Sequence, residues 1–199
     1  MENLTGRVLD LGCGKNKLRG AIGVDFHDNT DADVVHDLNR FPYPFGDDEF
    51  DGILLNHVLE HLEDVIKVME EVYRIAKPDA IVVVNAPYFT SVDAFTDPTH
   101  KHFFASRTLD YLTGDYGEFD YYSSNVKFLK LNVEIRFWEW KKLKGFRFQN
   151  WIGLGLLANK FTKFYEVFFA HIFPAREIHY ELRVIIGEDF FEENKELEK

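Results

Sequence analysis

The sequence has few cysteines and no long apolar runs, and each shortage excludes a class of protein. Cys13 is the only cysteine, so the chain can form neither an intrachain disulfide nor a cysteine-based zinc site. No apolar run reaches the roughly 20 residues that a membrane-spanning helix needs. The opening MENLTGRVLDLG lacks the pattern of a signal peptide. We therefore expect a globular cytoplasmic protein without an integral membrane span.

Positive charge is also scarce. The net charge is -11 and the isoelectric point is about 5.2, which argues against a nucleic-acid partner. One stretch, residues 127–147, has the opposite balance. A solvated surface is its simpler interpretation, and a cationic surface for an anionic substrate is the alternative. Its basic residues are Lys127, Lys130, Arg136, Lys141, Lys142, Lys144 and Arg147.

The first half of the chain alternates short apolar runs with a helical pattern. Continuous apolar or β-branched runs of this length are typical of parallel strands that are buried on both faces. Apolar residues from Val58 to Ile75 recur at helical spacing, and Lys77, Pro78 and Asp79 are expected to end that helix. The alternation predicts an open α/β sheet. The expected strands lie at 7–12, 21–26, 32–37, 50–56 and 80–87.

The second half changes character. A polar and aromatic loop at 88–104 precedes an expected helix at 106–114, and strands are expected at 127–140 and 177–186. A further helix at 151–173 is expected to pack on the sheet, although its apolar face could also lie on a membrane or bind a lipophilic substrate. That face would comprise Trp151, Leu154, Leu157, Phe161, Phe164, Phe168 and Ile172.

The segment VLDLGCGKN, residues 8–16, combines the end of a buried strand with a glycine turn. Gly12 and Gly14 permit a sharp turn and let a ligand approach the backbone closely. The next two expected strands carry Asp25 and Asp37 at their carboxyl ends. One such carboxylate can accept both hydroxyls of a ribose, and the other can accept the amine of an adenine. Since open α/β sheets bind ligands at the carboxyl ends of their strands, the pattern indicates a nucleotide-type ligand.

Two cofactor classes compete for this turn. A dinucleotide enzyme needs G-x-G-x-x-G, and Lys17 stands where the third glycine should be. Asp10 would repel a pyrophosphate, whereas its carboxylate suits a ligand that carries an ammonium group. A nicotinamide-dependent dehydrogenase is therefore disfavoured.

Several segments occur in a fixed order from residue 6 to about residue 90: VLDLGCG, GVDF, HDLNRFPYPFGDDEFDGILLNHVLEHL and RIAKPDA. In these segments the sequence resembles the class I S-adenosylmethionine (SAM)-dependent methyltransferases, especially the small "type 11" kind. We accordingly expect a single domain over 1–199 with a Rossmann-like, three-layer α/β sandwich. Its seven-stranded sheet would be mostly parallel with the last strand antiparallel, and an aromatic helical insertion would lie at about 150–174.

The resemblance also implies a role for each strand tip. Asp10 and the glycine turn would hold the methionine part of SAM, and Asp25 would hold the ribose. Asp37 and Leu38 would hold the adenine, while the end of the fourth strand would line the floor below the sulfonium. The candidate cofactor residues are Asp10, Gly12, Cys13, Gly14, Asp25, Phe26, Asp37, Leu38, Asn56 and His57.

The sequence departs from that family in two places. Asn16 stands where the family commonly has a third glycine. The connection KNKLRGAIGV, from Gly14 to Asp25, is too short for the helix that is usually found there. We therefore expect the cofactor site to be more open on that side.

Methyl transfer from a sulfonium is an in-line displacement, so the enzyme must mainly align its acceptor. An oxygen acceptor also has to lose a proton. The loop after the fifth expected strand supplies candidates: His100 as base or substrate ligand, with Asp97 and Tyr88 completing the catalytic set. The alternative is that Asp97 caps the loop and that the imidazoles lie at the surface.

The run His57–His61 reads H-x-x-E-H. On a helix its two imidazoles would share a face and could bind zinc, but its place after a buried parallel strand disfavours a protease. It also resembles the E-x-x-E-H run through which some O-methyltransferases bind Mg²⁺, with a histidine replacing the first glutamate. No metal is assigned from the sequence. Whether Glu60 and His61 bind one, with His100 or His102, is left open.

The sequence thus predicts a SAM-dependent methyltransferase. The acceptor would be a small or lipid-linked molecule, with oxygen as the accepting atom, and the loop at 88–104 and the aromatic helix would cover it. The alternative is a non-catalytic SAM-binding partner subunit or sensor of the same fold. A homodimer is possible.

Overall fold

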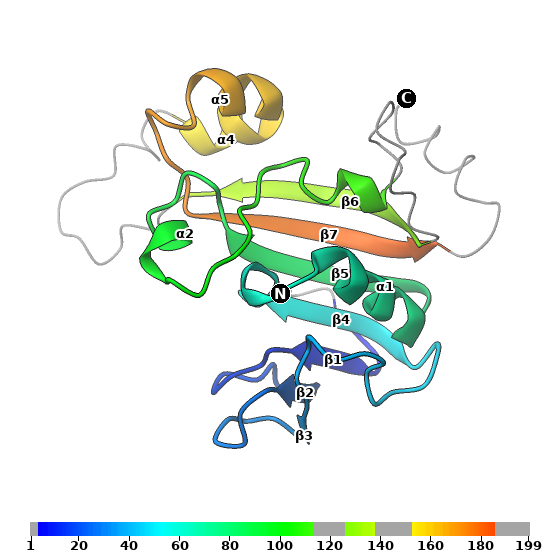
Figure 1. Cartoon of the computed structure of the whole chain (residues 1–199). Coiled ribbons are helices and arrows are strands. Elements are labelled where there is room, and N and C mark those ends of the chain that lie inside the picture. The colour runs from blue at the N-terminus through cyan, green and yellow to red at the C-terminus, as the bar shows by residue number, and fades with distance from the viewer. Residues whose placement is uncertain (1–3, 114–125, 138–152, 186–199) are drawn as a thin grey trace.

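The computed structural model describes residues 4–113, 126–137 and 153–185. A seven-stranded sheet runs through them in the order β3-β2-β1-β4-β5-β7-β6 (Figure 1). Its strands are β1 (Val8–Leu11), β2 (Ile22–Asp25), β3 (Val34–Val35), β4 (Phe50–Asn56), β5 (Ala76–Pro87), β6 (Lys127–Arg136) and β7 (Glu177–Ile185). The helices are η1 (Leu59–His61), α1 (Val65–Ile75), α2 (Asp93–Thr96), η2 (Asp110–Leu112), α4 (Leu154–Lys160) and α5 (Thr162–Phe168).

The sheet confirms the predicted fold class. The strands from β3 to β5 pair in parallel, whereas β7 runs antiparallel between β5 and β6. Every residue of β1 is buried, and so is most of β4, as expected for parallel strands covered on both faces. The connection from Gly12 to Ala21 contains no helix, which confirms the short link expected there.

The predicted helix that begins near Val58 is wrong at its start. The chain forms only the 3₁₀ turn η1, and α1 then begins after Asp64, whose side chain accepts a hydrogen bond from Lys67 N at 3.1 Å. This N-cap satisfies a backbone donor that a continuous helix would have paired internally. Strand β5 follows α1 directly, so Pro78 lies in β5 rather than in a loop. The buried face of α1 is formed by Val68, Met69, Val72 and Ile75.

Arg74 of α1 forms hydrogen bonds that hold the Pro-rich loop before β4 against this helix. Arg74 donates to both carboxylate oxygens of Glu71 at 2.8 and 2.9 Å. Its guanidinium also donates to the backbone carbonyls of Tyr43 and Phe45. Glu71 in turn accepts from Tyr43 N at 2.8 Å. The hydrogen bonds of Arg74 lower the pKa of Glu71.

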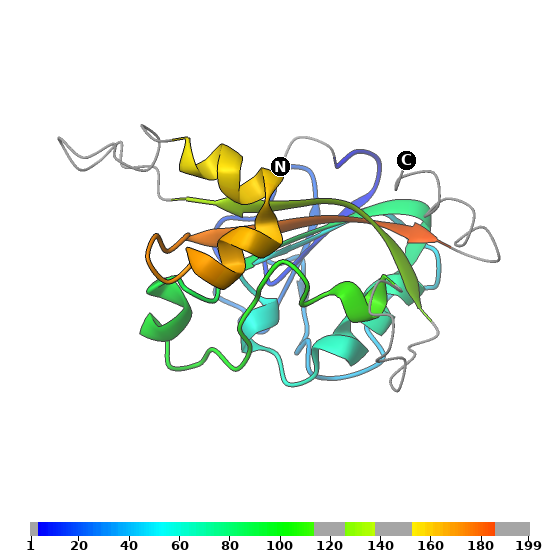
Figure 2. The same cartoon turned by 90° about the horizontal axis from the view of Figure 1, so that it is seen from above.

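The aromatic helix expected at 151–173 is instead two short helices, which bury Leu154 of the predicted face together with Ala158 and Tyr165. Asn159 bonds to Ile135 N and O on the outer side of β6 and so fixes α4 there, while Tyr165 OH donates to Phe173 O. These hydrogen bonds fix the two helices so that most of the predicted apolar face stays exposed. The helices sit at the β6 end of the sheet, whereas α1 lies near β5 (Figures 1 and 2). The predicted apolar residues that remain exposed are Leu157, Phe161, Phe164, Phe168 and Ile172.

Other expectations have mixed outcomes. The expected helix at 106–114 is reduced to η2 among the described residues. Much of the basic stretch, and Trp151, lie outside the residues that the structure describes. Of the described cations, Lys130 pairs with Asp110 and Arg136 pairs with Glu134. No helix in the described ranges is long and apolar enough to cross a bilayer. The extent of a single domain over 1–199 stays a prediction.

The arginine anchor generates a stability prediction. Replacing Arg74 by Met should lower the free energy of unfolding by about 2–4 kcal/mol, because Glu71 would lose its charged donor in a largely buried place. Urea denaturation measures this change. The matched control is Lys67→Met on the same helix, whose ion pair with Asp64 is long and exposed and should contribute nothing measurable. Equal stability of the two variants would contradict the anchor.

Candidate functional site

The glycine turn is folded onto the tip of β2. Gly12 N and Cys13 N both donate to Val24 O, at 2.8 and 3.1 Å. Gly14 N donates to the Asp25 carboxylate at 2.9 Å. This bond places the turn after β1 beside the acid that the sequence assigns to the ribose.

The two glycines of the turn differ in their surroundings. Both have positive φ angles, 70° for Gly12 and 56° for Gly14. A Cβ at Gly12 would lie 2.4 Å from Val58 Cγ2, whereas a Cβ at Gly14 would meet nothing within 4 Å. Gly12 is therefore required by packing, and Gly14 leaves space over the turn that a ligand can approach.

Asp25 retains capacity for a ligand. Its carboxylate accepts from Gly14 N and from His27 N, which uses two of about four acceptor positions. The remaining positions suit the paired hydroxyls of a ribose. Phe26 beside it is 62% exposed, so its ring is available to a flat ligand group.

Asp10 near the end of β1 and Cys13 in the glycine turn are both buried. Asp10 is 3% exposed and accepts from Leu18 N at 2.7 Å. Burial raises its pKa despite that hydrogen bond. Burial likewise raises the pKa of the Cys13 thiol to about 11, with Asp10 and Asp25 adding to the effect. Cys13 is therefore an unreactive packing residue.

The predicted adenine end of the site is less open. Asp37 accepts from Asn39 N at 3.0 Å and pairs with Arg40 at 3.4 Å. Leu38 is 5% exposed and packs in the core. Its carbonyl accepts from Tyr43 OH. The side chain of Leu38 therefore supports the site rather than lining it.

The end of β4 carries a strained histidine. His57 has a φ of 56°, a conformation that non-glycine residues hold only when their surroundings fix them. Its backbone N donates to Asn85 O, and its Nε2 lies 2.8 Å from Glu177 Oε2. The hydrogen-bonded Glu177 carboxylate and then the nearby Glu60 carboxylate raise the pKa of His57 to about 9. Asn56 accepts from Asn85 Nδ2 at 3.0 Å.

Glu177 is a candidate site residue that sequence reasoning missed, and it bonds Arg136 of the basic stretch. Glu177 begins β7, and because β7 is antiparallel its first residue lies at the carboxyl edge of the parallel strands. Burial tends to raise the pKa of Glu177, but its bonds with His57 and Arg136 hold it below the usual range. The polar residue that opens the expected strand at 177–186 was the available signal.

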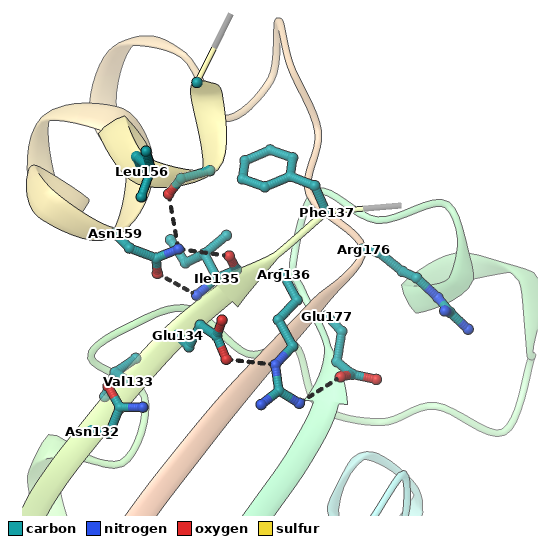
Figure 3. A pocket seen from close by; sticks show the side chains of 12 residues that line it. Asn132, Val133, Glu134, Ile135, Arg136, Phe137, Leu156, Asn159, Arg176 and Glu177 are labelled. Atoms are coloured by element: carbon teal, nitrogen blue, oxygen red, sulfur yellow. Dashed lines mark hydrogen bonds and ion pairs between the residues drawn. The ribbon is translucent and has the colours of Figure 1, made fainter. Parts of the chain in front are cut away.

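A pocket of about 890 Å³ adjoins this network (Figure 3). Arg136 donates to Glu134 at 2.7 Å and to Glu177 at 3.3 Å along its floor. Phe137 and Leu156 supply apolar walls, and α4 with the ends of β6 and β7 forms its frame. Its size suits a small organic molecule.

The predicted catalytic residues do not form one cluster. Tyr88 is fully buried and its hydroxyl donates to Glu166, and burial raises its pKa, so its position favours packing over catalysis. Asp97 accepts from the backbone N and the hydroxyl of Thr99, which is the capping alternative. His100 lies against His61, with ring centroids 4.6 Å apart.

Comparison with known proteins decides the family. A family model described as a methyltransferase domain matches residues 2–117. The chain belongs to this family of methyltransferase domains. The sequence-based identification is thereby confirmed, and membership supports the predicted cofactor, SAM. No curated protein matches the chain.

Solved structures agree with this methyltransferase fold. A SAM-dependent methyltransferase from Archaeoglobus fulgidus matches with a TM-score of 0.57 and 21% identity, over 89% of this chain and 85% of its own. A putative methyltransferase from Haloferax volcanii, in complex with the Trm112 activator, matches with a TM-score of 0.58 and 15% identity, over 93% and 86%. A Mesorhizobium loti SAM-dependent methyltransferase matches with a TM-score of 0.54 and 14% identity, over 92% and 93%. At these identities the likeness establishes the fold.

Because Gly12 and Gly14 have different surroundings, we expect alanine at the two positions to destabilise this methyltransferase domain by different amounts. Gly12→Ala should cost about 2–5 kcal/mol of unfolding free energy, because backbone strain and the clash with Val58 add. Gly14→Ala should cost only about 1–2 kcal/mol of backbone strain. Urea denaturation of both variants measures the difference. Equal losses would mean that the contact with Val58 does not constrain the turn.

Proposed function

We propose that the chain binds SAM across the tips of β1, β2 and β4 and transfers its methyl group to a small or lipid-linked acceptor, with oxygen as the accepting atom. The observation that carries the proposal is the bond from Gly14 N to Asp25. It brings a ligand-accessible glycine turn and a carboxylate with free acceptor positions to neighbouring strand tips. Crevices at these tips are where open α/β sheets bind ligands.

The residues present fit SAM. Asp25 would accept the ribose hydroxyls, and Gly14 leaves room for the methionine part of the cofactor. Asp10 supports the turn, and its buried negative charge favours an ammonium group nearby. Bound SAM would supply a methyl group on a positively charged sulfur, which is already activated for displacement. The chain's own task is then to orient the acceptor and to exclude water.

The pocket beside Glu177 is our candidate for the acceptor. Its network reaches His57 at the tip of β4, next to the proposed cofactor site. Apolar walls above a charged floor suit a molecule with one polar and one apolar end. Leu156 lines the pocket and is also 82% exposed, which supports an acceptor whose apolar part extends outward, as a lipid-linked one would.

Of the predicted catalytic set, His100 has the most suitable position. Tyr88 is buried and Asp97 is held by Thr99, whereas His100 uses only Nδ1, towards Ala94 O at 3.0 Å. Its Nε2 is therefore available as an acceptor or ligand atom.

Binding of S-adenosylhomocysteine tests the proposal. Isothermal titration should give one site in the wild-type chain. Asp25→Asn should weaken binding about 10–100-fold, because a charged acceptor of hydrogen bonds is lost. Asp28→Asn is the matched control, since Asp28 lies exposed in the same loop, and it should bind like wild type. A folded wild-type chain that binds neither SAM nor S-adenosylhomocysteine would end the proposal.

The alternative is a non-catalytic SAM-binding partner subunit or sensor. The exposed apolar residues of α4 and α5 favour it, because such a surface suits contact with another protein. Binding of SAM without turnover on a panel of acceptors, together with a stable complex with a second protein, would support this alternative. A homodimer and a cytoplasmic location also stay predictions.

A further inference from the structure

Glu60 is a buried carboxylate without hydrogen bonds. It is 1% exposed, and neither of its oxygens has a hydrogen-bond partner among the described residues. Within the described ranges it forms an ion pair with His57, whose Nδ1 lies 3.4 Å from Oε1 without hydrogen-bond geometry. A buried charge is costly unless it is hydrogen-bonded, paired or bound to a metal. One oxygen of Glu60 thus lies near His57, but neither oxygen accepts a hydrogen bond from a described residue.

Two imidazoles lie close to the Glu60 carboxylate. His61 follows Glu60 in η1, and His100 comes from the loop after α2. One ligand atom from each of Glu60, His61 and His100 lies within 4.8 Å of the other two. The loop is held in place because Lys101 N donates to Glu60 O at 2.7 Å. Three metal-ligating groups from two distant segments are therefore brought together by backbone contacts.

Hydrogen bonds fix which nitrogen of each ring is free. His100 Nδ1 faces the carbonyl of Ala94 at 3.0 Å; because a carbonyl only accepts, this nitrogen carries the proton. Thr99 Oγ1 donates its single hydrogen to Asp97 at 2.7 Å. It must therefore accept from His61 Nδ1, which lies 2.8 Å away. In the neutral rings, both Nε2 atoms carry a lone pair.

This arrangement is the one that metal sites use around their histidines. A ligating imidazole commonly donates its other N–H to a carbonyl or to a carboxylate-linked group, which orients the ring. Ala94 O does this for His100, and the Thr99–Asp97 pair does it for His61. His102, the other histidine of the loop, does not join the group, since its Nε2 is bonded to Leu62 O.

We propose that Glu60, His61 and His100 bind a divalent transition-metal ion of the zinc class. Two imidazole nitrogens and one carboxylate suit Zn²⁺, Co²⁺ or Fe²⁺, whereas Mg²⁺ prefers a shell of oxygens. Three protein ligands leave a coordination position open. The sequence assigned no metal and left binding by Glu60 and His61 open; this inference adds the metal and gives His100 the role of a ligand.

A metal ion at Glu60 would lie near the candidate acceptor pocket, and its role there rests on the proposed function. His57 contacts Glu60 and also Glu177, which lines the candidate acceptor pocket. An ion at Glu60 would thus lie close to the end of β4 and could polarise an oxygen acceptor. The metal site itself does not depend on this step, and its test uses neither SAM nor turnover.

The experiment measures metal uptake by the chain without a histidine tag. After treatment with a chelator, the protein is dialysed against Co²⁺ or Zn²⁺, and bound metal is counted by elemental analysis. We expect one equivalent per chain, visible d–d absorption from Co²⁺, and a higher melting temperature with either ion. Mg²⁺ at the same concentration should produce neither binding nor a shift.

Variants locate the site. Glu60→Gln and His100→Gln should each reduce Co²⁺ affinity by more than about 100-fold, and Thr99→Val should reduce it by about 10–100-fold through loss of ring orientation. His102→Gln is the matched control and should bind like wild type. Circular dichroism checks folding, and the exposed Thr99 variant keeps the test decisive if Glu60→Gln misfolds. Absence of Co²⁺ uptake by the wild type, or equal uptake by all four variants, would overturn the proposal.

The same variants separate this inference from the proposed function. S-adenosylhomocysteine should bind Glu60→Gln as it binds wild type, because the ribose acid Asp25 is untouched. Metal uptake without S-adenosylhomocysteine binding would refute the proposed cofactor site alone. S-adenosylhomocysteine binding without metal uptake would refute the metal site alone.

Discussion

The hydrogen bond from Gly14 N to the Asp25 carboxylate is the contact on which the proposed cofactor site depends. It closes the turn after β1 onto the tip of β2 without the helix that usually joins two such strands. Asp25 thereby fixes the backbone of the turn and still offers acceptor positions outward. Because so little chain covers this side, the geometry rests on a few bonds: this one, the paired donors to Val24 O, and the Asp10–Leu18 contact.

A second constraint joins the parallel and antiparallel parts of the sheet. β7 begins at the carboxyl edge of the parallel strands, so Glu177 pairs with Pro87 at the end of β5 and with Arg136 at the end of β6. It bonds His57 on one side and Arg136 on the other. This network explains how His57 is held at a positive φ, and it connects the end of β4 to the pocket over β6. The reversed direction of β7 thus places the charge of Glu177 beside His57.

The sequence predicted what depends on local pattern. Buried runs such as 50–56 and 80–87 specified parallel strands, and the glycine turn was expected beside Asp25, where Gly14 N bonds the carboxylate. That a ligand binds at this edge stays a proposal. It failed where contacts between distant segments decide. Tyr88 looked like a catalytic residue in a polar loop, but its hydroxyl reaches Glu166 of α5 in the interior. The apolar face of the helix expected at 151–173 was predicted to pack on the sheet, yet most of it is exposed. Asn159 fixes α4 against β6, and the spacing of apolar residues does not reveal such a bond.

The central claim is that SAM lies across the tips of β1, β2 and β4. A crystal structure of the chain with S-adenosylhomocysteine tests it most directly. In that crystal structure we expect the ribose hydroxyls to contact the Asp25 carboxylate, the homocysteine to run over Gly14, and the sulfur to face the end of β4 near Asn56. A ligand bound elsewhere, or one whose ribose makes no contact with Asp25, would contradict the account.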